Sequence, residues 1–272
     1  MDSKITIDNI KKIEAGIREK YIKVANNPEG QFNYPTGIKG LEALHYDKTL
    51  IDELPTVVAS FYCGVGNVFS LWKINQGDRI LDIGCGAGID TILAAILVGP
   101  NGSVIGVDIV PEMITRAKKN LSLMDFDNVI FQKVSGKNLP FPDDTFDVVI
   151  SNGVINLIPD KEAVMSEILR VLKPAGRLMM ADQVTAGSIQ KDIKARLANW
   201  FQWEGGTIPG DDFLASLKKV GFKNSDLAGE TGFNSTPKTK GVYFLAEKPT
   251  LSLNLWAFDC SNAPADIKAL KM

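Results

Sequence analysis

The chain has 272 residues, of which 45% are hydrophobic and 23% are charged, and its formal net charge is −2. This balance provides no strong field for nucleic acid or for an anionic lipid surface, and no apolar stretch approaches the ~20 residues of a membrane span. The only histidine is His45, so histidine-rich metal sites and most serine–histidine–aspartate schemes are excluded.

The three cysteines, Cys63, Cys85 and Cys260, are scattered along the chain and form no C-x-x-C pair. An odd, dispersed set favours reduced thiols over a disulfide framework or a structural metal site. The N-terminus also lacks the apolar segment of a signal peptide. We therefore expect a cytoplasmic protein without a metal site.

Residues 1–72 are predicted to form an N-terminal helical region, a possible lid, ahead of the core. Residues 4–26 have apolar side chains at helical spacing and a basic opposite face. Such a helix could lie on a membrane, but it lacks Trp and Phe anchors, so we expect it to pack across the core. A second helix is predicted over residues 47–61, limited or kinked by Pro55. A glycine-rich aromatic loop follows at residues 61–69.

The core is predicted to begin with a strand, a glycine turn and a helix. Residues 79–83 form a short apolar run that is typical of a buried parallel strand. Gly84, Gly86 and Gly88 follow, and an amphipathic helix begins at Ile89. Glycines let a ligand approach the main chain, and the helix N-terminus presents unpaired N–H groups to it. This stretch therefore predicts half of a nucleotide-binding unit.

The rest of the core, to residue 248, alternates strands with helices. A second strand ends in Asp108, and an acid at this place accepts hydrogen bonds from both hydroxyls of a ribose. Alternation at this spacing predicts an α/β, doubly wound parallel sheet whose carboxyl ends share one edge. The remaining predicted elements are helices from residues 111 and 160, strands at 129–131, 146–152 and 177–182, a turn at 173–176, a helix at 211–220, strands at 223–229 and 241–247, and an apolar tail at 249–272.

The glycine spacing identifies a family. Gly84-x-Gly86-x-Gly88, with Asp82 before it and Asp108 after the second strand, resembles the class I S-adenosylmethionine-dependent methyltransferases. The resemblance implies S-adenosylmethionine as cofactor and S-adenosylhomocysteine as product. It also implies a seven-stranded, mostly parallel sheet whose last strand is antiparallel.

Residues from about 61 to 247 resemble one branch more closely, the arsenite methyltransferases, and more distantly the ubiquinone/menaquinone C-methyltransferases. The most specific match is the run Ser151-Asn152-x-Val154-Ile155-Asn156-Leu157.

Arsenite methyltransferases hold trivalent arsenic with cysteine thiolates, a soft ligand set for a soft centre. The family positions of these cysteines fall here on Val65, Gly153 and Trp203. Cys63 lies two residues from the first of them, and one thiol alone does not chelate arsenic. The resemblance therefore carries over the fold and the cofactor site, and arsenite stays an alternative acceptor.

For the cofactor, the resemblance implies roles at the sheet edge. Asp82 would lie near the methionine amino group, Asp108 would hold the ribose, and Ile109 would cover the adenine. Ser135, with Gly136, would meet the adenine edge, where relatives often have Asp, and a Ser hydroxyl can also accept a hydrogen bond. The predicted cofactor-binding set is Asp82, Gly84, Cys85, Gly86, Gly88, Asp108, Ile109, Ser135, Gly136, Ser151 and Asn152.

The acceptor site is predicted to be aromatic. Its candidate residues are Tyr62, Cys63, Gly153, Trp200 and Trp203, of which Gly153 would open space. Aromatic faces suit a flat organic acceptor and attract a sulfonium cation. The alternative is that these aromatic side chains only pack the core or a lid.

No outstanding general base is visible. A thiolate acceptor needs none at neutral pH, whereas an aromatic carbon or a hydroxyl must lose a proton. The candidates are His45, Tyr62, Glu204 and Asp211, each of which is also explained as a surface or capping residue.

Three functional classes stay open. The favoured one is a methyltransferase that acts on a small molecule, with a flat organic or soft heteroatom acceptor and no nucleic-acid partner. A nicotinamide-dependent oxidoreductase is disfavoured because the third glycine of G-x-G-x-x-G is missing. A catalytically silent S-adenosylmethionine-binding protein is the third. The oligomeric state is not predicted.

Overall fold

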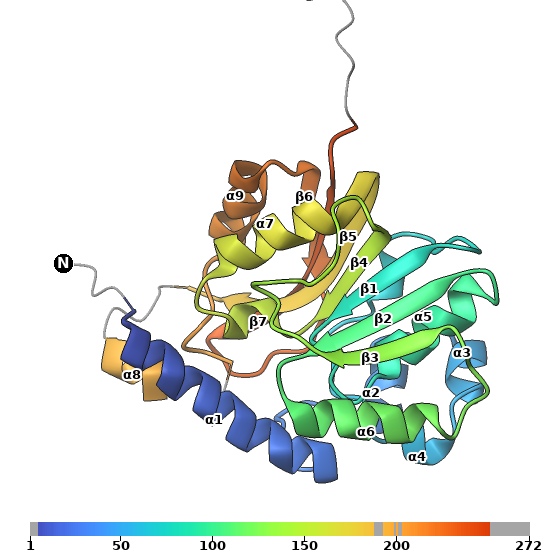
Figure 1. The fold of residues 1–272 in the computed structure, drawn as a ribbon. Coiled ribbons are helices and arrows are strands. Elements are labelled where there is room, and N and C mark those ends of the chain that lie inside the picture. Colours follow the sequence, from blue (N-terminus) through green and yellow to red (C-terminus); the bar gives the residue numbers. More distant parts are fainter. Residues whose placement is uncertain (1–4, 188–192, 199, 201–202, 251–272) are drawn as a thin grey trace, which may run out of the picture.

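A single seven-stranded sheet forms the centre of the protein (Figure 1). The computed structural model describes residues 5–187, 193–198, 200 and 203–250. The strand order is β3-β2-β1-β4-β5-β7-β6, in which β1 to β5 are parallel and β7 runs antiparallel to both neighbours. This confirms the predicted sheet. The strands are β1 Arg79–Ile83, β2 Ser103–Asp108, β3 Val129–Lys133, β4 Phe146–Asn152, β5 Leu172–Thr185, β6 Lys223–Glu230 and β7 Thr239–Glu247.

Helices cover both faces of this sheet because successive strand side chains point to opposite sides. Ile80 belongs to one buried cluster, with α5, α6 and the N-terminal helices, whereas Leu81 belongs to the other, with α7 and α9. The helices are α1 Ile7–Asn26, α2 Gly37–Ala43, α3 Lys48–Asp52, α4 Thr56–Ala59, α5 Ile89–Val98, α6 Pro111–Leu121, α7 Lys161–Val171, α8 Ile193–Ala198 and α9 Gly210–Val220, with 3₁₀ turns η1 Val68–Ser70 and η2 Ile155–Leu157.

Two local expectations differ from the structure. The helix expected over residues 47–61 is split into α3 and α4, because Pro55 cannot continue a helix and instead precedes the first residue of α4. The turn expected at residues 173–176 lies within β5 as an irregularity. There Phe146 pairs with Leu172 but Val148 pairs with Arg177, so the β5 segment carries extra residues.

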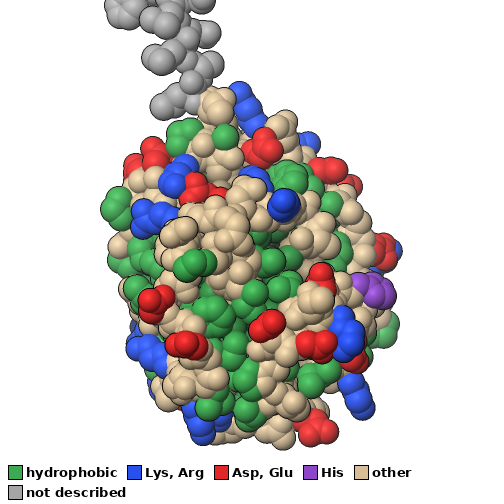
Figure 2. Space-filling view, turned by 90° about the vertical axis from the view of Figure 1, so that its right-hand side faces the viewer, with side chains coloured by type: hydrophobic (Ala, Val, Ile, Leu, Met, Phe, Trp, Pro, Cys, Tyr) green, Lys and Arg blue, Asp and Glu red, His purple; other side chains and the backbone are tan. Residues whose placement is uncertain are grey.

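Helix α1 lies beside α6 and across the end of the sheet where β1, β2 and β4 finish (Figure 1). Arg116 of α6 donates a hydrogen bond to the Ala25 carbonyl at 2.7 Å, and Arg18 pairs with Glu112 at 2.8 Å. Charged side chains of both signs are interspersed over the face shown in Figure 2. The packing of α1 across the core agrees with the sequence-based expectation.

The tail expected at 249–272 lies outside the residues that the structure describes, apart from 249 and 250.

Candidate active site

A cavity lies at the carboxyl ends of β1, β2 and β4, under helix α1. Its lining includes nine of the eleven predicted cofactor residues: Asp82, Gly84, Cys85, Gly86, Asp108, Ile109, Ser135, Gly136 and Asn152. Glu14, Ile17 and Tyr21 of α1 close it from the opposite side. Parallel strands thus bring together residues that are far apart in the sequence.

The glycine turn after β1 depends on left-handed backbone. Gly84, Gly86 and Gly88 have φ values of +72°, +54° and +86°, which side-chain-bearing residues rarely adopt. A Cβ on Gly84 would overlap Val154, and one on Gly88 would overlap Phe131. Gly88 is the N-cap of α5 and lies outside the cavity lining. Its role is therefore to form the turn that leads into α5.

Asp108 ties the second strand to this turn. One carboxylate oxygen accepts a hydrogen bond from the Gly86 N–H at 3.0 Å and the other accepts from the Val110 N–H at 2.8 Å. Burial raises the pKa of Asp108 to about 6, and these backbone donors oppose the rise. Each oxygen keeps a lone pair for a further donor. Beside it, the apolar Ile109 side chain is 43% exposed and lines the cavity.

Asp82 lies deeper than Asp108. Its carboxylate is 2% exposed and accepts a hydrogen bond from the Thr91 hydroxyl at 2.5 Å. Burial, with the nearby Asp90 charge, raises its pKa well above the usual range. The cavity floor therefore holds closely spaced acidic groups.

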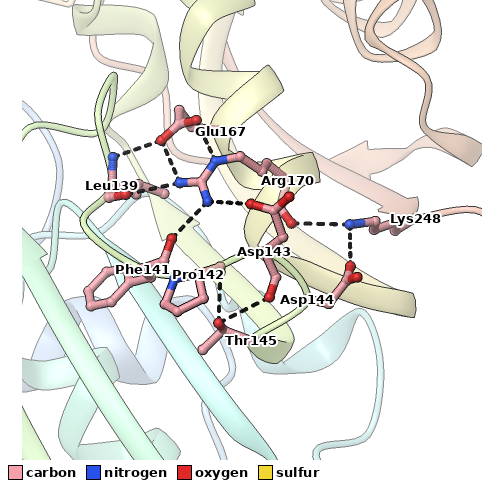
Figure 3. Close-up of polar contacts among 9 residues, drawn as sticks. All are labelled: Leu139, Phe141, Pro142, Asp143, Asp144, Thr145, Glu167, Arg170 and Lys248. Atoms are coloured by element: carbon pink, nitrogen blue, oxygen red, sulfur yellow. Dashed lines mark hydrogen bonds and ion pairs between the residues drawn. The ribbon is translucent and has the colours of Figure 1, made fainter.

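A loop after β3 brings Ser135 and Gly136 to the cavity. Arg170 of α7 fixes the far part of this loop by donating to the carbonyls of Leu139 and Phe141 (Figure 3). The same guanidinium pairs with Glu167 at 2.7 Å and with Asp143 at 2.8 Å. A planar fork of donors can satisfy all these acceptors at once, which suits Arg rather than Lys.

Asn152, at the end of β4, organises a buried polar network. Its side-chain oxygen accepts hydrogen bonds from the N–H groups of Val65 and Gly66 at 2.8 and 3.2 Å. Its nitrogen donates to Asp90 at 2.9 Å, and Asp90 also accepts from the Tyr46 hydroxyl at 2.8 Å. Burial raises the pKa of Asp90 to about 6. The network fixes the loop at residues 64–66 against the first turn of α5.

Sequence reasoning missed Asp90, Tyr46 and the α1 residues in this site. An acid in the first turn of the helix after the glycines was the available signal for Asp90.

Ser151 has a different position from its neighbour Asn152. It is fully buried and donates to the Ile83 carbonyl at 3.1 Å, outside the cavity lining.

The predicted acceptor residues also divide into those that line the cavity and one that does not. Tyr62, Cys63, Gly153 and Trp203 line the cavity, whereas Trp200 does not. Trp200 is 1% exposed, and its indole N–H donates to the Leu157 carbonyl at 2.8 Å.

Gly153 does not open space, contrary to the expectation. A Cβ there would overlap the Trp203 indole, so the indole fills that volume. The same Cβ would lie 3.6 Å from the Val65 side chain. Val65, Gly153 and Trp203, the three positions at which the resemblance places thiolates, therefore meet in the structure.

Of the acceptor-site candidates, Tyr62 and Cys63 are protonated at neutral pH, so neither is available there as a base. Burial raises the pKa of Cys63 to about 12 and the pKa of Tyr62 well above 10. His45 and Asp211 are exposed, and Glu204 pairs with Lys238 at 3.0 Å. Of the four candidate bases only Tyr62 lines the cavity.

The described part of the chain contains neither a candidate metal cluster nor a candidate membrane-spanning helix. No group there of three or more His, Cys, Asp or Glu side chains is arranged to hold a metal ion. None of the helices within it is both long and apolar enough to cross a membrane.

Comparisons with known proteins agree on one family. A family model described as a methyltransferase domain matches residues 74–224. An arsenite methyltransferase of Halobacterium salinarum is 36% identical over 214 residues, which cover 78% of this chain and 52% of that protein. A demethylmenaquinone methyltransferase of Symbiobacterium thermophilum is 40% identical over 104 residues, covering 38% of this chain and 41% of that protein.

Among solved structures, an arsenic(III) S-adenosylmethionine methyltransferase from Chlamydomonas reinhardtii superposes with a TM-score of 0.60 at 26% identity, covering 80% of this chain and 75% of that one. The chain spans about half the length of the curated arsenite methyltransferases that it matches.

Proposed function

Because the chain belongs to the methyltransferase domain family, we propose that it transfers a methyl group from S-adenosylmethionine to a small-molecule acceptor. The observation that carries the proposal is the hydrogen bond that the Gly86 N–H donates to the Asp108 carboxylate at the cavity. It joins the glycine turn and the acid of the second strand in one site. The relatives named as methyltransferases support the same reaction.

The cavity residues fit this cofactor. Asp108 has free lone pairs for two ribose hydroxyls, and the exposed Ile109 side chain offers an apolar face for the adenine. Asp82 would attract the methionine amino group, and Ser135 would meet the adenine edge. Ser151 and Gly88 would contribute from outside the cavity. Ser151 would position the end of β1 by its hydrogen bond to the Ile83 carbonyl, and Gly88 would position the start of α5 as its N-cap.

The bound cofactor would supply an electrophilic methyl group. The task of the chain is then to hold the acceptor in line with that methyl group and to exclude water. Such alignment contributes as much as ~7–11 kcal/mol in well-oriented reactions. Helix α1 covers the cavity with Ile17 and Tyr21, and Trp203 closes it beyond Gly153. We propose that residues 1–72 form this cover over a catalytic domain at 73–248, in a cytoplasmic protein with reduced thiols.

For the acceptor, we propose a flat organic molecule or a soft heteroatom. The aromatic side chains of Tyr62 and Trp203 support the first, and a soft nucleophile needs no strong base. Arsenite is the alternative suggested by the relatives. Against it, Val65, Gly153 and Trp203 bring no thiol to their meeting point, and burial keeps the Cys63 thiol protonated.

The test is methyl transfer from radiolabelled S-adenosylmethionine to a panel of aryl thiols, quinols and arsenite. We expect labelled product from at least one organic acceptor and none from arsenite. Calorimetry with S-adenosylhomocysteine and with the nicotinamide dinucleotides runs in parallel. Cofactor binding without any methylated product would favour a silent binding protein, and nicotinamide binding alone would favour an oxidoreductase.

A further inference from the structure

We propose that Trp203 recognises the methyl acceptor, and that its indole N–H donates a hydrogen bond to an oxygen atom on a planar aromatic acceptor. This inference rests on the proposed function and names its substrate class. It goes beyond an aromatic lining, because it assigns one side chain a directional polar contact.

The place of Trp203 follows from the strand order. Asp108 and Ser135, which would hold the adenosine, follow β2 and β3, and the glycine turn follows β1. Gly153 follows β4, on the opposite side of β1, and the Trp203 indole lies against it. Trp203 thus lines the cavity at the end away from the adenosine residues, where the acceptor must enter.

The indole N–H of Trp203 makes no well-formed hydrogen bond within the described part of the chain. Trp203 is 2% exposed, and its Nε1 atom has no hydrogen-bond partner among the residues described. The Tyr21 hydroxyl interacts with it without reaching hydrogen-bond geometry, and that contact lowers the otherwise raised pKa of Tyr21. Leaving a buried donor without a hydrogen bond is unfavourable, because the group has lost its water partner on folding. An acceptor oxygen between the two groups would remove that cost.

The surroundings suit a planar ring. Phe32 and Tyr34 meet the Trp203 ring edge-on, each with centroids 6.1 Å away, and hold it in place. Trp203 itself has φ +68°, an uncommon backbone conformation for a bulky residue. Strained residues that persist are concentrated at functional sites. Phe61 and Tyr62 complete an aromatic lining in which the Trp203 N–H is the directional donor.

The test compares two probes that differ in one substituent, a hydroxyl group in one and a methyl group in the other. 2-Naphthol and 2-methylnaphthalene have the same planar rings and nearly the same size. We expect the complex with S-adenosylhomocysteine to bind 2-naphthol at least about tenfold more tightly, because a site built for a hydrogen bond rejects the analogue that lacks it. In Trp203→Phe the ratio should fall close to one, while affinity for 2-methylnaphthalene changes little.

Trp200→Phe is the matched control, because Trp200 comes from the same segment but its N–H already bonds the Leu157 carbonyl. It should keep the wild-type ratio. A measurement on wild-type protein guards against a misfolded variant. With ¹⁵N-labelled tryptophan, one of the four indole N–H resonances should shift on adding 2-naphthol and not on adding 2-methylnaphthalene.

An unchanged ratio in folded Trp203→Phe would overturn the inference. So would a wild-type complex that binds neither probe or does not distinguish them. Failure to bind S-adenosylhomocysteine would instead contradict the proposed function. Tight S-adenosylhomocysteine binding without discrimination between the probes would contradict this inference alone.

Discussion

Gly153 and Trp203 occupy complementary space, since the indole of one fills the volume that a side chain of the other would need. Both have left-handed backbone, with φ +73° at Gly153 and +68° at Trp203. The two residues come from the end of β4 and from the segment between α8 and α9. Both residues line the cavity.

Gly153→Ala should therefore be strongly destabilising. The added methyl group would overlap a buried indole. In addition, alanine would have to adopt the positive φ that glycine has at this position. Together these effects should lower the free energy of unfolding by about 2–4 kcal/mol. Urea denaturation measures the change.

Gly30→Ala is the control, because Gly30 also has φ +73° but a Cβ there meets nothing within 4 Å. It should cost only the backbone part, about 1–2 kcal/mol. In a Trp203→Ala background, the stability lost through Gly153→Ala should fall to the cost of Gly30→Ala. Equal losses at the two glycines in the wild-type background would show that the overlap with Trp203 does not matter.

Cofactor affinity should depend on the charge of Asp108. The pKa of this group is raised to about 6 in the free protein. Under the proposed function, the ribose hydroxyls would donate to its anionic form. Affinity for S-adenosylhomocysteine should then be constant above about pH 7 and fall up to tenfold per pH unit below pH 6. Asp108→Asn should weaken binding by about 10–100-fold and flatten this dependence. Calorimetry from pH 5 to 8 follows both effects.

Asp182→Asn serves as the control for Asp108→Asn. Burial also raises the pKa of Asp182 to about 6, but Asp182 is not part of the cavity lining. This variant should keep the wild-type pH dependence of binding. Folding stability depends on pH in the opposite direction from cofactor binding. A carboxyl group whose pKa is raised on folding contributes stability at low pH, and this contribution is lost as pH rises from about 4 to about 6. Identical binding profiles for the two variants would rule out a specific role for Asp108.

The sheet, the glycine turn and Asp108 were predictable because each has a local signature. Apolar runs mark the strands, and the glycines at positive φ are concentrated where the chain turns tightly. By contrast, the Asn152–Asp90–Tyr46 network joins three segments that are distant in the sequence, and no local pattern pairs them. Composition alone does not reveal which distant polar groups meet.

Trp200 and Trp203 show the same limit at a single site. Both were predicted to line the acceptor pocket, as similar residues in one segment. The structure directs one indole to the Leu157 carbonyl and the other into the cavity. Trp203 also has a left-handed backbone, which hydrophobic periodicity does not reveal.

Asn152→Asp should make stability depend strongly on pH. The new oxygen would replace the nitrogen that now donates to Asp90 at 2.9 Å and to the Gly66 carbonyl at 2.7 Å. The new, partly buried carboxylate would then lie beside the buried Asp90 carboxylate, which raises the pKa of at least one of them. Stability contributed by the protonated form is lost as pH rises. We expect a small loss near pH 5 and a loss of about 2–4 kcal/mol at pH 8.

Asn152→Ala provides the comparison for Asn152→Asp. It removes the same hydrogen bonds without adding a charge, so its cost should vary much less between pH 5 and pH 8. Urea denaturation at both pH values gives the two differences. Parallel pH profiles for the two variants would mean that Asp90 does not interact with residue 152.

Arg170→Lys should weaken both the fold and cofactor binding, although Lys keeps the positive charge. The guanidinium donates hydrogen bonds to Glu167, to Asp143 and to two carbonyls of the loop after β3, which contains Ser135 (Figure 3). An ammonium group cannot reproduce this fork, so we expect a loss of about 1–3 kcal/mol in urea denaturation and severalfold weaker S-adenosylhomocysteine binding. Arg18→Ala, which breaks an exposed pair with Glu112, should change stability far less than Arg170→Lys and should leave S-adenosylhomocysteine binding unchanged. If Arg170→Lys matched that control in both measurements, the loop would not depend on Arg170.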